Sequence, residues 1–462
     1  MIGVIADDLT GAAEIGAVGV RHGLRAEIIV AGLGFRRQAF QHRKPAKAGT
    51  PKADLVCVDT DSRASAPDEA ARRAAAAAKL LRQAGAKWIY KKVDSVLRGN
   101  VLAEIEAIMR EMERRSLGSG TGVPPVRFNR SRAADQKLTG GTPVPLPSGS
   151  PNQEIAAPRV LLHPANPSLG RIIRNGKYFV GGKLIHKTEF ARDPAHPRWT
   201  ADVCALLNGS AANLIRVCKL RDPLPDEGVV ICESTSPRDV QLWAGRADGI
   251  MLLAGGAEFF AAVLVSRGAR TALSGRNGKH TRKLKVRADS AVRAPQPQEL
   301  FVCGSTSESS TKFIGAARRA GTPIFSLPGE VASGADFTRA AAKAISGQVA
   351  EAFQSRSRVI LHIGLRTIRE APIARKLSGY LTRLAGAVIN RATVSHVYAE
   401  GGATAVELVR RMNWTRLKVL REVAPGVATL LVEGRKPMLL TIKPGSYVWP
   451  EEIWEPPGAA RK

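Results

Sequence analysis

The chain has 462 residues, enough for two or three domains that each bury a core. Hydrophobic residues make up 44% and charged residues 24%, which excludes wholesale disorder and a collagen-like or coiled-coil build. The 69 Lys and Arg against 40 Asp and Glu give a formal charge of +29, which favours anionic partners without identifying them.

Strand-like apolar runs alternate with helical stretches through the first half of the chain. We expect strands at residues 2–6, 26–30, 55–58, 88–90, 160–162 and 229–232, and helices at residues 10–22, 66–83 and 101–115. This alternation predicts an α/β domain over residues 1–266 with a largely parallel sheet.

Two segments interrupt the alternation. Residues 117–158 are rich in Gly, Pro and Ser and form an imperfect repeat, which predicts an inserted surface loop. Residues 267–298 hold nine basic residues and one acid, Asp289, and predict a basic linker. Beyond it, strands are expected at 300–303, 359–363 and 394–399, so residues 299–462 predict a second α/β domain with a ligand cleft between the two.

Polar residues follow three of the expected N-terminal strands. Asp7 and Asp8 follow the first strand, and one of them faces a ligand while the other caps the next helix, or both act as caps. Arg63 follows the strand at 55–58, and residues 91–98 combine ammonium, carboxylate, hydroxyl and guanidinium groups after the strand at 88–90. Because parallel strands end at one edge, these groups predict a site for an anionic substrate, with Arg171 as a further cation.

Glycine-rich turns in the second half join a strand to a helix. Gly304-Ser305 and Gly401-Gly402 would offer free backbone N–H groups to a phosphate, and Lys443 would add a cation. No Gly-x-x-x-x-Gly-Lys-Ser/Thr motif occurs, so any nucleotide site is not a P-loop. The eight histidines show no metal-ligand spacing, and no protein-bound metal is expected.

Three motifs in chain order resemble the four-carbon acid sugar kinase family. They are Ile-Ala-Asp-Asp-Leu-Thr-Gly-Ala at 5–12, Lys-Val-Asp-Ser-Val-Leu-Arg-Gly-Asn at 92–100 and Gly-Gly-Ala-Thr at 401–404. Pro164 to Arg171 and the Gly-Ser-Thr-Ser turn at 304–307 extend the resemblance almost end to end. The family implies an N-terminal domain that binds the sugar acid and a C-terminal domain that binds ATP.

The resemblance implies an ATP-dependent enzyme that phosphorylates a terminal hydroxyl of threonate, erythronate or an oxo-tetronate, with Mg²⁺ on the phosphates. It places at the sugar acid Asp8, Arg63, Lys92, Val93, Asp94 and Ser95, and at the nucleotide Gly255, Gly256, Gly364, Leu365, Arg366, Gly401 and Gly402. Arg63 and Lys92 would hold the substrate carboxylate or hydroxyls, and either Asp8 or Asp94 would be the catalytic base.

Ala257 and Glu258 stand where the family shows a Gly-Ser-x-Gly-like turn, so a weakened member that only binds sugar acids stays open. A basic nucleic-acid-binding protein is the other alternative, but only 5% of residues are aromatic and no nucleic-acid motif occurs, so it is not preferred. The five cysteines form no Cys-x-x-Cys pair, which favours a reducing cytoplasm. No secretory signal or membrane span is expected, and a homodimer stays open.

Overall fold

A computed structural model describes residues 1–30, 53–113, 159–193, 196–207, 215–248, 251–268, 297–332, 335–364, 371–434, 436–445 and 447–454. The predicted insertion at 117–158 and nearly all of the basic linker lie outside these residues. Within the described chain, no helix is both long enough and apolar enough to cross a membrane.

The N-terminal part alternates strands and helices as the apolar runs predict. Its elements are β1 (Ile2–Ala6), α1 (Leu9–Arg21), β2 (Ala26–Val30), β3 (Leu55–Asp59), α3 (Pro67–Gln83), β4 (Trp88–Lys92), α4 (Val101–Glu113), β5 (Arg159–His163), α5 (Val203–Leu206), β9 (Ile215–Cys218), β10 (Gly228–Cys232), α6 (Pro237–Gly245), β11 (Leu252–Gly255) and α7 (Ala257–Ser266). A small antiparallel sheet of β6 (Arg171–Arg174), β7 (Lys177–Val180) and β8 (Lys183–Leu184) is attached to it.

The C-terminal part has the same character until its last three strands. Its elements are β12 (Gln298–Cys303), α8 (Glu308–Arg319), β13 (Ile324–Ser326), α9 (Gly329–Ala332), α10 (Arg339–Ser355), β14 (Arg358–His362), α11 (Ala371–Arg391), β15 (Val394–Glu400), α12 (Gly402–Arg411), β16 (Arg416–Ala424), β17 (Val427–Val432) and β18 (Met438–Lys443). The predicted α/β class is therefore confirmed in both parts.

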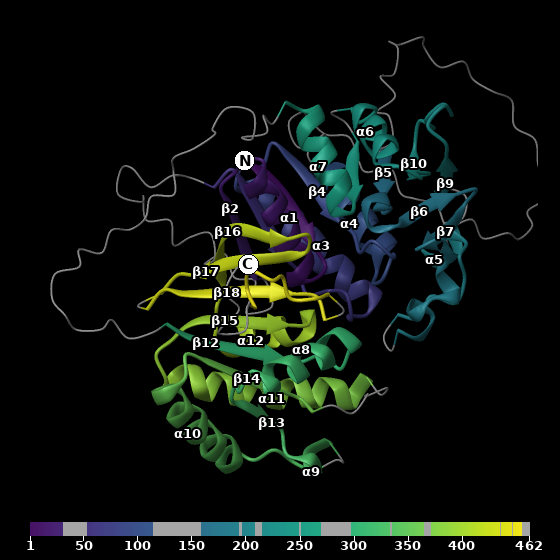
Figure 1. Ribbon diagram of the computed structural model, residues 1–462. Helices are drawn as coiled ribbons and strands as arrows, with labels where there is room; N and C mark the ends of the chain where they lie inside the picture. The colour runs from purple at the N-terminus through teal and green to yellow at the C-terminus, as the bar shows by residue number, and fades with distance from the viewer. Residues whose placement is uncertain are drawn as a thin grey trace, which may run out of the picture.

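One sheet of 15 strands runs through both parts of the molecule, in the order β13-β14-β12-β15-β18-β17-β16-β2-β3-β1-β4-β11-β5-β10-β9 (Figure 1). Within the block of strands on each side of the hairpin β16–β17 the strands pair in parallel. The two hairpin strands pair antiparallel with each other, with β2 and with β18. The sequence predicts two parallel sheets, and the hairpin that fuses them lies at 416–432, where no strands are predicted.

The residues that follow the carboxyl ends of β1 and β15 lie close together, since a methyl group on Gly402 would lie 3.7 Å from Asp8 Oδ2. The three antiparallel pairings make the two blocks run in opposite directions, which in a flat sheet would separate those ends. Six strand-to-strand steps separate β15 from β1. At about 20–25° per step they add roughly 120–150° of rotation, which reverses most of that separation.

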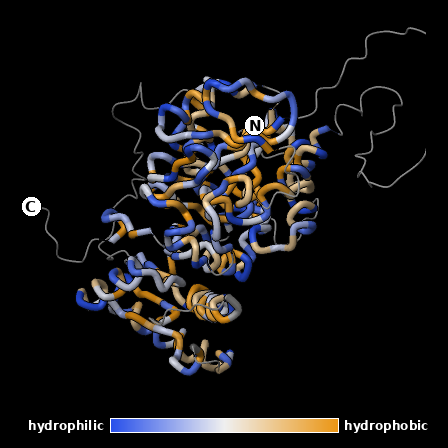
Figure 2. Tube along the Cα trace, turned by 90° about the vertical axis from the view of Figure 1, so that its right-hand side faces the viewer, coloured by the Kyte–Doolittle hydropathy of each residue, from blue (hydrophilic) through white to orange (hydrophobic). Residues whose placement is uncertain are grey.

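Helix α1 occupies the junction and packs against β16 as well as β3. Its buried face is made largely of Gly and Ala, which lets the helix approach the strands closely. Hydrophobic residues gather inside both parts and hydrophilic residues on the outside (Figure 2). The N-terminus of α1, where the first candidate residues lie, is thus fixed between the two parts.

Candidate active site

A cavity of about 770 Å³ lies between the two parts. On one side it is lined by the residues after β1, β3 and β4, and on the other by the start of α12 and the turn after β18. Of the predicted sugar-acid residues, the structure places on its wall Asp8, Arg63, Lys92, Asp94, Ser95 and Arg171. Val93 is buried beside the cavity, and its backbone N–H donates to the Gly255 carbonyl.

Arg63 joins the two aspartates that follow β1. Its Nε and Nη2 donate to Asp7 at 2.7 and 2.9 Å, and its Nη1 donates to Asp8 Oδ2 at 2.7 Å. Asp8 is also the N-cap of α1, because its Oδ1 accepts the Gly11 N–H at 2.7 Å. One carboxylate thus both caps the helix and faces the cavity, which combines the two alternatives that the sequence leaves open.

The ammonium group of Lys92 is balanced by an acid from α1. Its Nζ lies 3.1 Å from Glu14 Oε2 and donates to the Val93 carbonyl. The neighbouring Lys91 points to the other face, where it pairs with the buried Glu104 at 2.6 Å. Lys92 therefore reaches the cavity with its charge already compensated.

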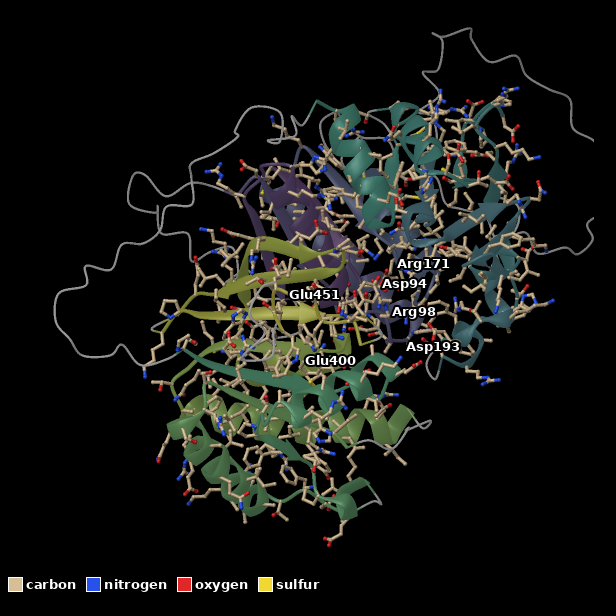
Figure 3. All side chains as sticks on the ribbon, viewed as in Figure 1. Asp94, Arg98, Arg171, Asp193, Glu400 and Glu451 are labelled. Carbon is tan, nitrogen blue, oxygen red and sulfur yellow. The ribbon has the colours of Figure 1, made fainter. Side chains whose placement is uncertain are left out.

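Asp94 is held by Arg98, a cavity residue that also bonds Asp193 (Figure 3). Arg98 Nε and Nη2 donate to the two oxygens of Asp94 at 3.0 and 2.8 Å, and Arg63 lies 3.9 Å away. Burial alone would raise the pKa of Asp94, but Arg98 and Arg63 outweigh burial and hold it well below its ordinary value. Asp94 is therefore a weak proton acceptor.

In Asp8, burial and the neighbouring charges shift the pKa in the opposite direction from that in Asp94. Burial raises its pKa above the ordinary value; Arg63 opposes this shift and the neighbouring Asp7 adds to it. A carboxylate whose pKa lies closer to neutrality is the better general base. The structure thus distinguishes the two candidate bases that the sequence leaves equal.

Arg171 is a cation on the cavity wall without a carboxylate partner among the described residues. Its Nη1 donates to Ser95 Oγ, and its guanidinium lies 5.7 Å from the ring centroid of Phe190. Arg375, from α11, is a second lining cation with no described acid beside it. Among the described cavity residues, these two cations form no ion pair and are free to bind an anion.

The N-terminus of α12 faces the cavity without a side-chain cap. Gly401 is the N-cap residue of this helix, and its φ of 95° is a conformation that favours glycine. A glycine has no side chain that could cap the helix. The first backbone N–H groups of the helix thus have no intrahelical acceptor. A methyl group on Gly402 would lie 2.7 Å from Thr10 Oγ1 and 3.7 Å from Asp8 Oδ2, so this helix end directly faces the catalytic candidate.

Beside this helix end lies a layer of hydroxyl groups. Ser305 and Ser307 both donate to the Gly445 carbonyl, at 3.2 and 2.8 Å, and Gly445 lines the cavity. On the opposite side, the buried Thr10 Oγ1 has no hydrogen-bond partner among the described residues. An uncapped helix N-terminus and an unused hydroxyl form a cradle suited to phosphate.

The remaining predicted nucleotide residues lie elsewhere. Gly255 and Gly256 are buried behind the wall, where Tyr90 donates to the Gly256 carbonyl. Gly304 packs against Thr404, and Gly364 lies two residues beyond the end of β14 with φ of 106°. Leu365 and Arg366 lie outside the described residues, and the prediction for these positions stays a prediction.

Lys443 is buried rather than presented to a ligand. Its Nζ lies 3.5 Å from Glu400 and donates to the carbonyls of Pro444 and Tyr447. Burial lowers its pKa, opposed by Glu400. Lys443 thus stabilises the turn that contains Gly445 through these hydrogen bonds. It is not among the described residues that line the cavity.

The described residues do not form a protein-held magnesium site. No group of three or more His, Cys, Asp or Glu side chains among them is arranged to hold a metal. Asp7, Asp8 and Asp94 on the wall are each paired with an arginine. The Mg²⁺ dependence expected for transfer from ATP stays a prediction.

Several cavity residues were not among the predicted site residues. They include Thr10, Glu14, Asp61, Arg98, Asp193, Arg375, Arg410 and Tyr447. Arg98 lies in the same polar segment as Lys92 and Asp94, so its charge was a usable signal. Asp193, Arg375 and Arg410 come from segments far away in sequence, and nothing in their local pattern marks them.

The comparisons with known proteins agree with this two-part site. A family model described as a sugar-binding N-terminal domain matches residues 2–263, and one described as a nucleotide-binding C-terminal domain matches residues 300–447. The class defined by fold and site is thus an α/β protein with a sugar-binding and a nucleotide-binding part. The chain belongs to the four-carbon acid sugar kinase family.

Similar curated proteins carry kinase names. The chain is 26% identical over 258 residues to a D-threonate kinase of Salmonella typhimurium, covering 53% of this chain and 48% of that protein. It is 29% identical over 259 residues to a D-threonate kinase of Bordetella bronchiseptica, covering 54% and 50%. Both matches span about half of the relative. A 3-oxo-tetronate kinase of Pseudomonas fluorescens is 24% identical over 481 residues, covering 97% and 94%.

Two solved structures share the fold over nearly the whole chain. A Salmonella typhimurium LT2 protein named as a tRNA synthase superposes with a TM-score of 0.67 at 16% identity, with 96% of each chain covered. Haemophilus influenzae protein HI1011 gives 0.60 at 18% identity, also with 96% of each chain covered. At these identities the likeness establishes the architecture alone.

Proposed function

We propose that the protein is a kinase that transfers the γ-phosphoryl group of ATP to a terminal hydroxyl of a four-carbon sugar acid, of the threonate, erythronate or 3-oxo-tetronate type. The observation that carries this proposal is the position of Asp8. Its carboxylate lies between the polar wall formed by the N-terminal strands and the uncapped N-terminus of α12. The names of the similar proteins support the substrate class.

In the proposed reaction, Asp8 accepts the proton of the acceptor hydroxyl while the oxygen of that hydroxyl bonds to the γ-phosphorus. The bond between that phosphorus and the β–γ bridging oxygen breaks, and ADP leaves with the electron pair. The N–H groups at the start of α12 bind the phosphate oxygens. Arg63 holds Asp8 in place, and Arg171 binds the substrate carboxylate.

This assignment moves the carboxylate contact away from Arg63 and Lys92. Both cations already bond acids of the protein, Asp7 and Asp8 for Arg63 and Glu14 for Lys92. Their proposed contact with the substrate is through its hydroxyl groups. Arg171 is the nearby guanidinium on the sugar side that the described residues leave unneutralised.

The proposal is tested by coupled measurement of ADP release over a panel of four-carbon sugar acids. One of them should stimulate turnover, and Asp8→Asn should lower kcat by about 10²–10⁴ while ATP still binds. If no acid stimulates ADP release although ATP binds, the substrate class is wrong. If ATP does not bind, the alternative of a family member that only binds sugar acids gains support.

The pH dependence separates Asp8 from Asp94 as the base. Burial and Asp7 raise the pKa of Asp8 above 3.8, so kcat/KM should fall as pH drops through that raised pKa, where Asp8 takes up a proton. Asp94 would stay ionised throughout this range because its pKa lies well below 3.8. A profile that stays flat down to about pH 4 would exclude Asp8 as the base.

A further inference from the structure

A second hollow, of about 560 Å³, lies on the outer face of the C-terminal part, away from the catalytic cavity. It is formed by α10, α11 and the end of α12, which lie together in the lower half of Figure 1. We call it the basic groove. Its lining residues are Arg339, Ala342, Lys343, Ser346, Arg383, Ala387, Asn390, Arg391 and Arg411.

The groove holds five cationic side chains, and none of its lining residues is acidic. Arg339, Lys343 and Arg391 are exposed and form no ion pair with any described residue. Elsewhere, cations on helix surfaces pair with acids one turn away, as Arg73 does with Glu69. Arg411 is paired with Glu407, but the unpaired cations Arg339, Lys343 and Arg391 repel each other around one hollow, and a bound anion would remove that cost.

Two of the four guanidinium groups are held in place by the protein. Arg383 Nη1 donates to the Phe337 carbonyl at 2.7 Å, and its guanidinium lies 5.4 Å from the ring centroid of Tyr380. Arg411 Nη2 bonds Glu407 at 2.9 Å. Fixed cations lose less conformational entropy when they bind, so the groove is partly preorganised.

The groove is separate from the proposed phosphate cradle. Gly402 begins α12 at the catalytic cavity, and Arg411 ends the same helix at the groove. A helix of 10 residues is about 15 Å long. One nucleotide bound at the Gly402 end is therefore not what balances the charges of the groove.

We propose that the basic groove binds a small anion that carries several phosphate groups, a compact polyphosphate compound. The number of cations requires several negative charges, and the guanidinium forks suit phosphate oxygens. The hollow has the size of a small-molecule site and is bounded by three helices, so it fits a compact ligand better than an extended nucleic-acid strand. This site does not depend on the proposed kinase activity.

The test is titration calorimetry of the full chain with inorganic tripolyphosphate at low salt. The double variant Arg339→Ala/Lys343→Ala should weaken binding at the groove by about 10- to 100-fold, since each cation is a charge-assisted contact. The matched control Arg318→Ala/Arg319→Ala removes the same charge from exposed positions of α8. Its affinity for tripolyphosphate should stay within about twofold of that of the parent chain. The single variant Arg391→Gln should also weaken binding.

Thermal unfolding without ligand checks the folding of each variant. The double variant should be at least as stable as the parent chain, because it relieves repulsion beside the N-terminus of α10. Equal tripolyphosphate affinity in parent and double variant would overturn the proposal, as would an equal loss in the control. Groove-dependent binding of a 20-base-pair duplex that is tighter than binding of tripolyphosphate would show a nucleic-acid surface instead.

Discussion

Replacing Arg171 with alanine is the sharpest test of how the substrate would be oriented. Arg171 opens β6 and reaches the cavity beside Ser95. No described carboxylate depends on it, so the substitution leaves no acid unpaired. The change therefore removes a ligand contact and leaves no buried charge without its partner.

The expected loss follows from the strength of a hydrogen bond to a charged group. Such a bond contributes about 1.5–3 kcal/mol, which corresponds to a factor of about 10–150 in kcat/KM. Because the carboxylate is distant from the reacting hydroxyl in a four-carbon acid, the contact is equal in the ground and transition states. The loss in Arg171→Ala should therefore appear mainly as a raised KM.

The assay compares the acid with the four-carbon polyol in which a hydroxymethyl group replaces the carboxylate. Arg171→Ala should lower kcat/KM for the acid and leave that for the polyol nearly unchanged. Arg174→Ala is the matched control, since Arg174 lies on the same strand and is exposed over the Phe179 ring. An equal loss with both compounds would mean that Arg171 acts on the fold and not on the carboxylate.

Two further substitutions test the cradle and the buried acids. Gly402→Ala places a methyl group 2.7 Å from Thr10 Oγ1 and should lower kcat by up to about 100-fold while thermal stability holds; unchanged kinetics would contradict the cradle. Burial, with Asp8 adding to it, raises the pKa of Asp59 to about 8, so the folded chain keeps a proton that the unfolded chain loses above pH 4. The free energy of unfolding of the parent chain, measured in urea, should fall by up to about 4 kcal/mol between pH 5 and 8, and Asp59→Asn should remove this fall. If the free energy of unfolding depends on pH equally in the parent and the variant, the raised pKa of Asp59 is refuted.

The N-terminal half of the site can be predicted because the positions of its residues depend only on where each strand ends in the sequence. A strand that ends in polar residues places them at the carboxyl edge, and parallel neighbours share that edge. Asp8 and Arg63 follow β1 and β3, and Lys92 is the last residue of β4; the three strands are adjacent in the sheet. The structure accordingly brings these three side chains to one cavity.

The pairing of charges is not predictable from the same pattern. Arg63 is expected to bind substrate, yet Asp7 and Asp8 neutralise it, and Lys92 meets Glu14 from the following helix. Partner choice depends on how α1 lies against the strands, which is a property of tertiary packing. The same holds for Lys443, which the sequence predicts as a cation beside a phosphate and the fold buries against Glu400.

The way in which the two parts of the chain are joined is the feature that depends least on local sequence. The phosphate cradle of α12 and Asp8 meet because three antiparallel pairings reverse the second block and the sheet twist turns it back. Strand β16 contributes two irregularities in its register with β17, which locally increase that twist. The hairpin thus helps to set the geometry of the site, and its turn residue Gly426 lines the cavity. Changes in the hairpin should alter turnover by moving Gly402 relative to Asp8.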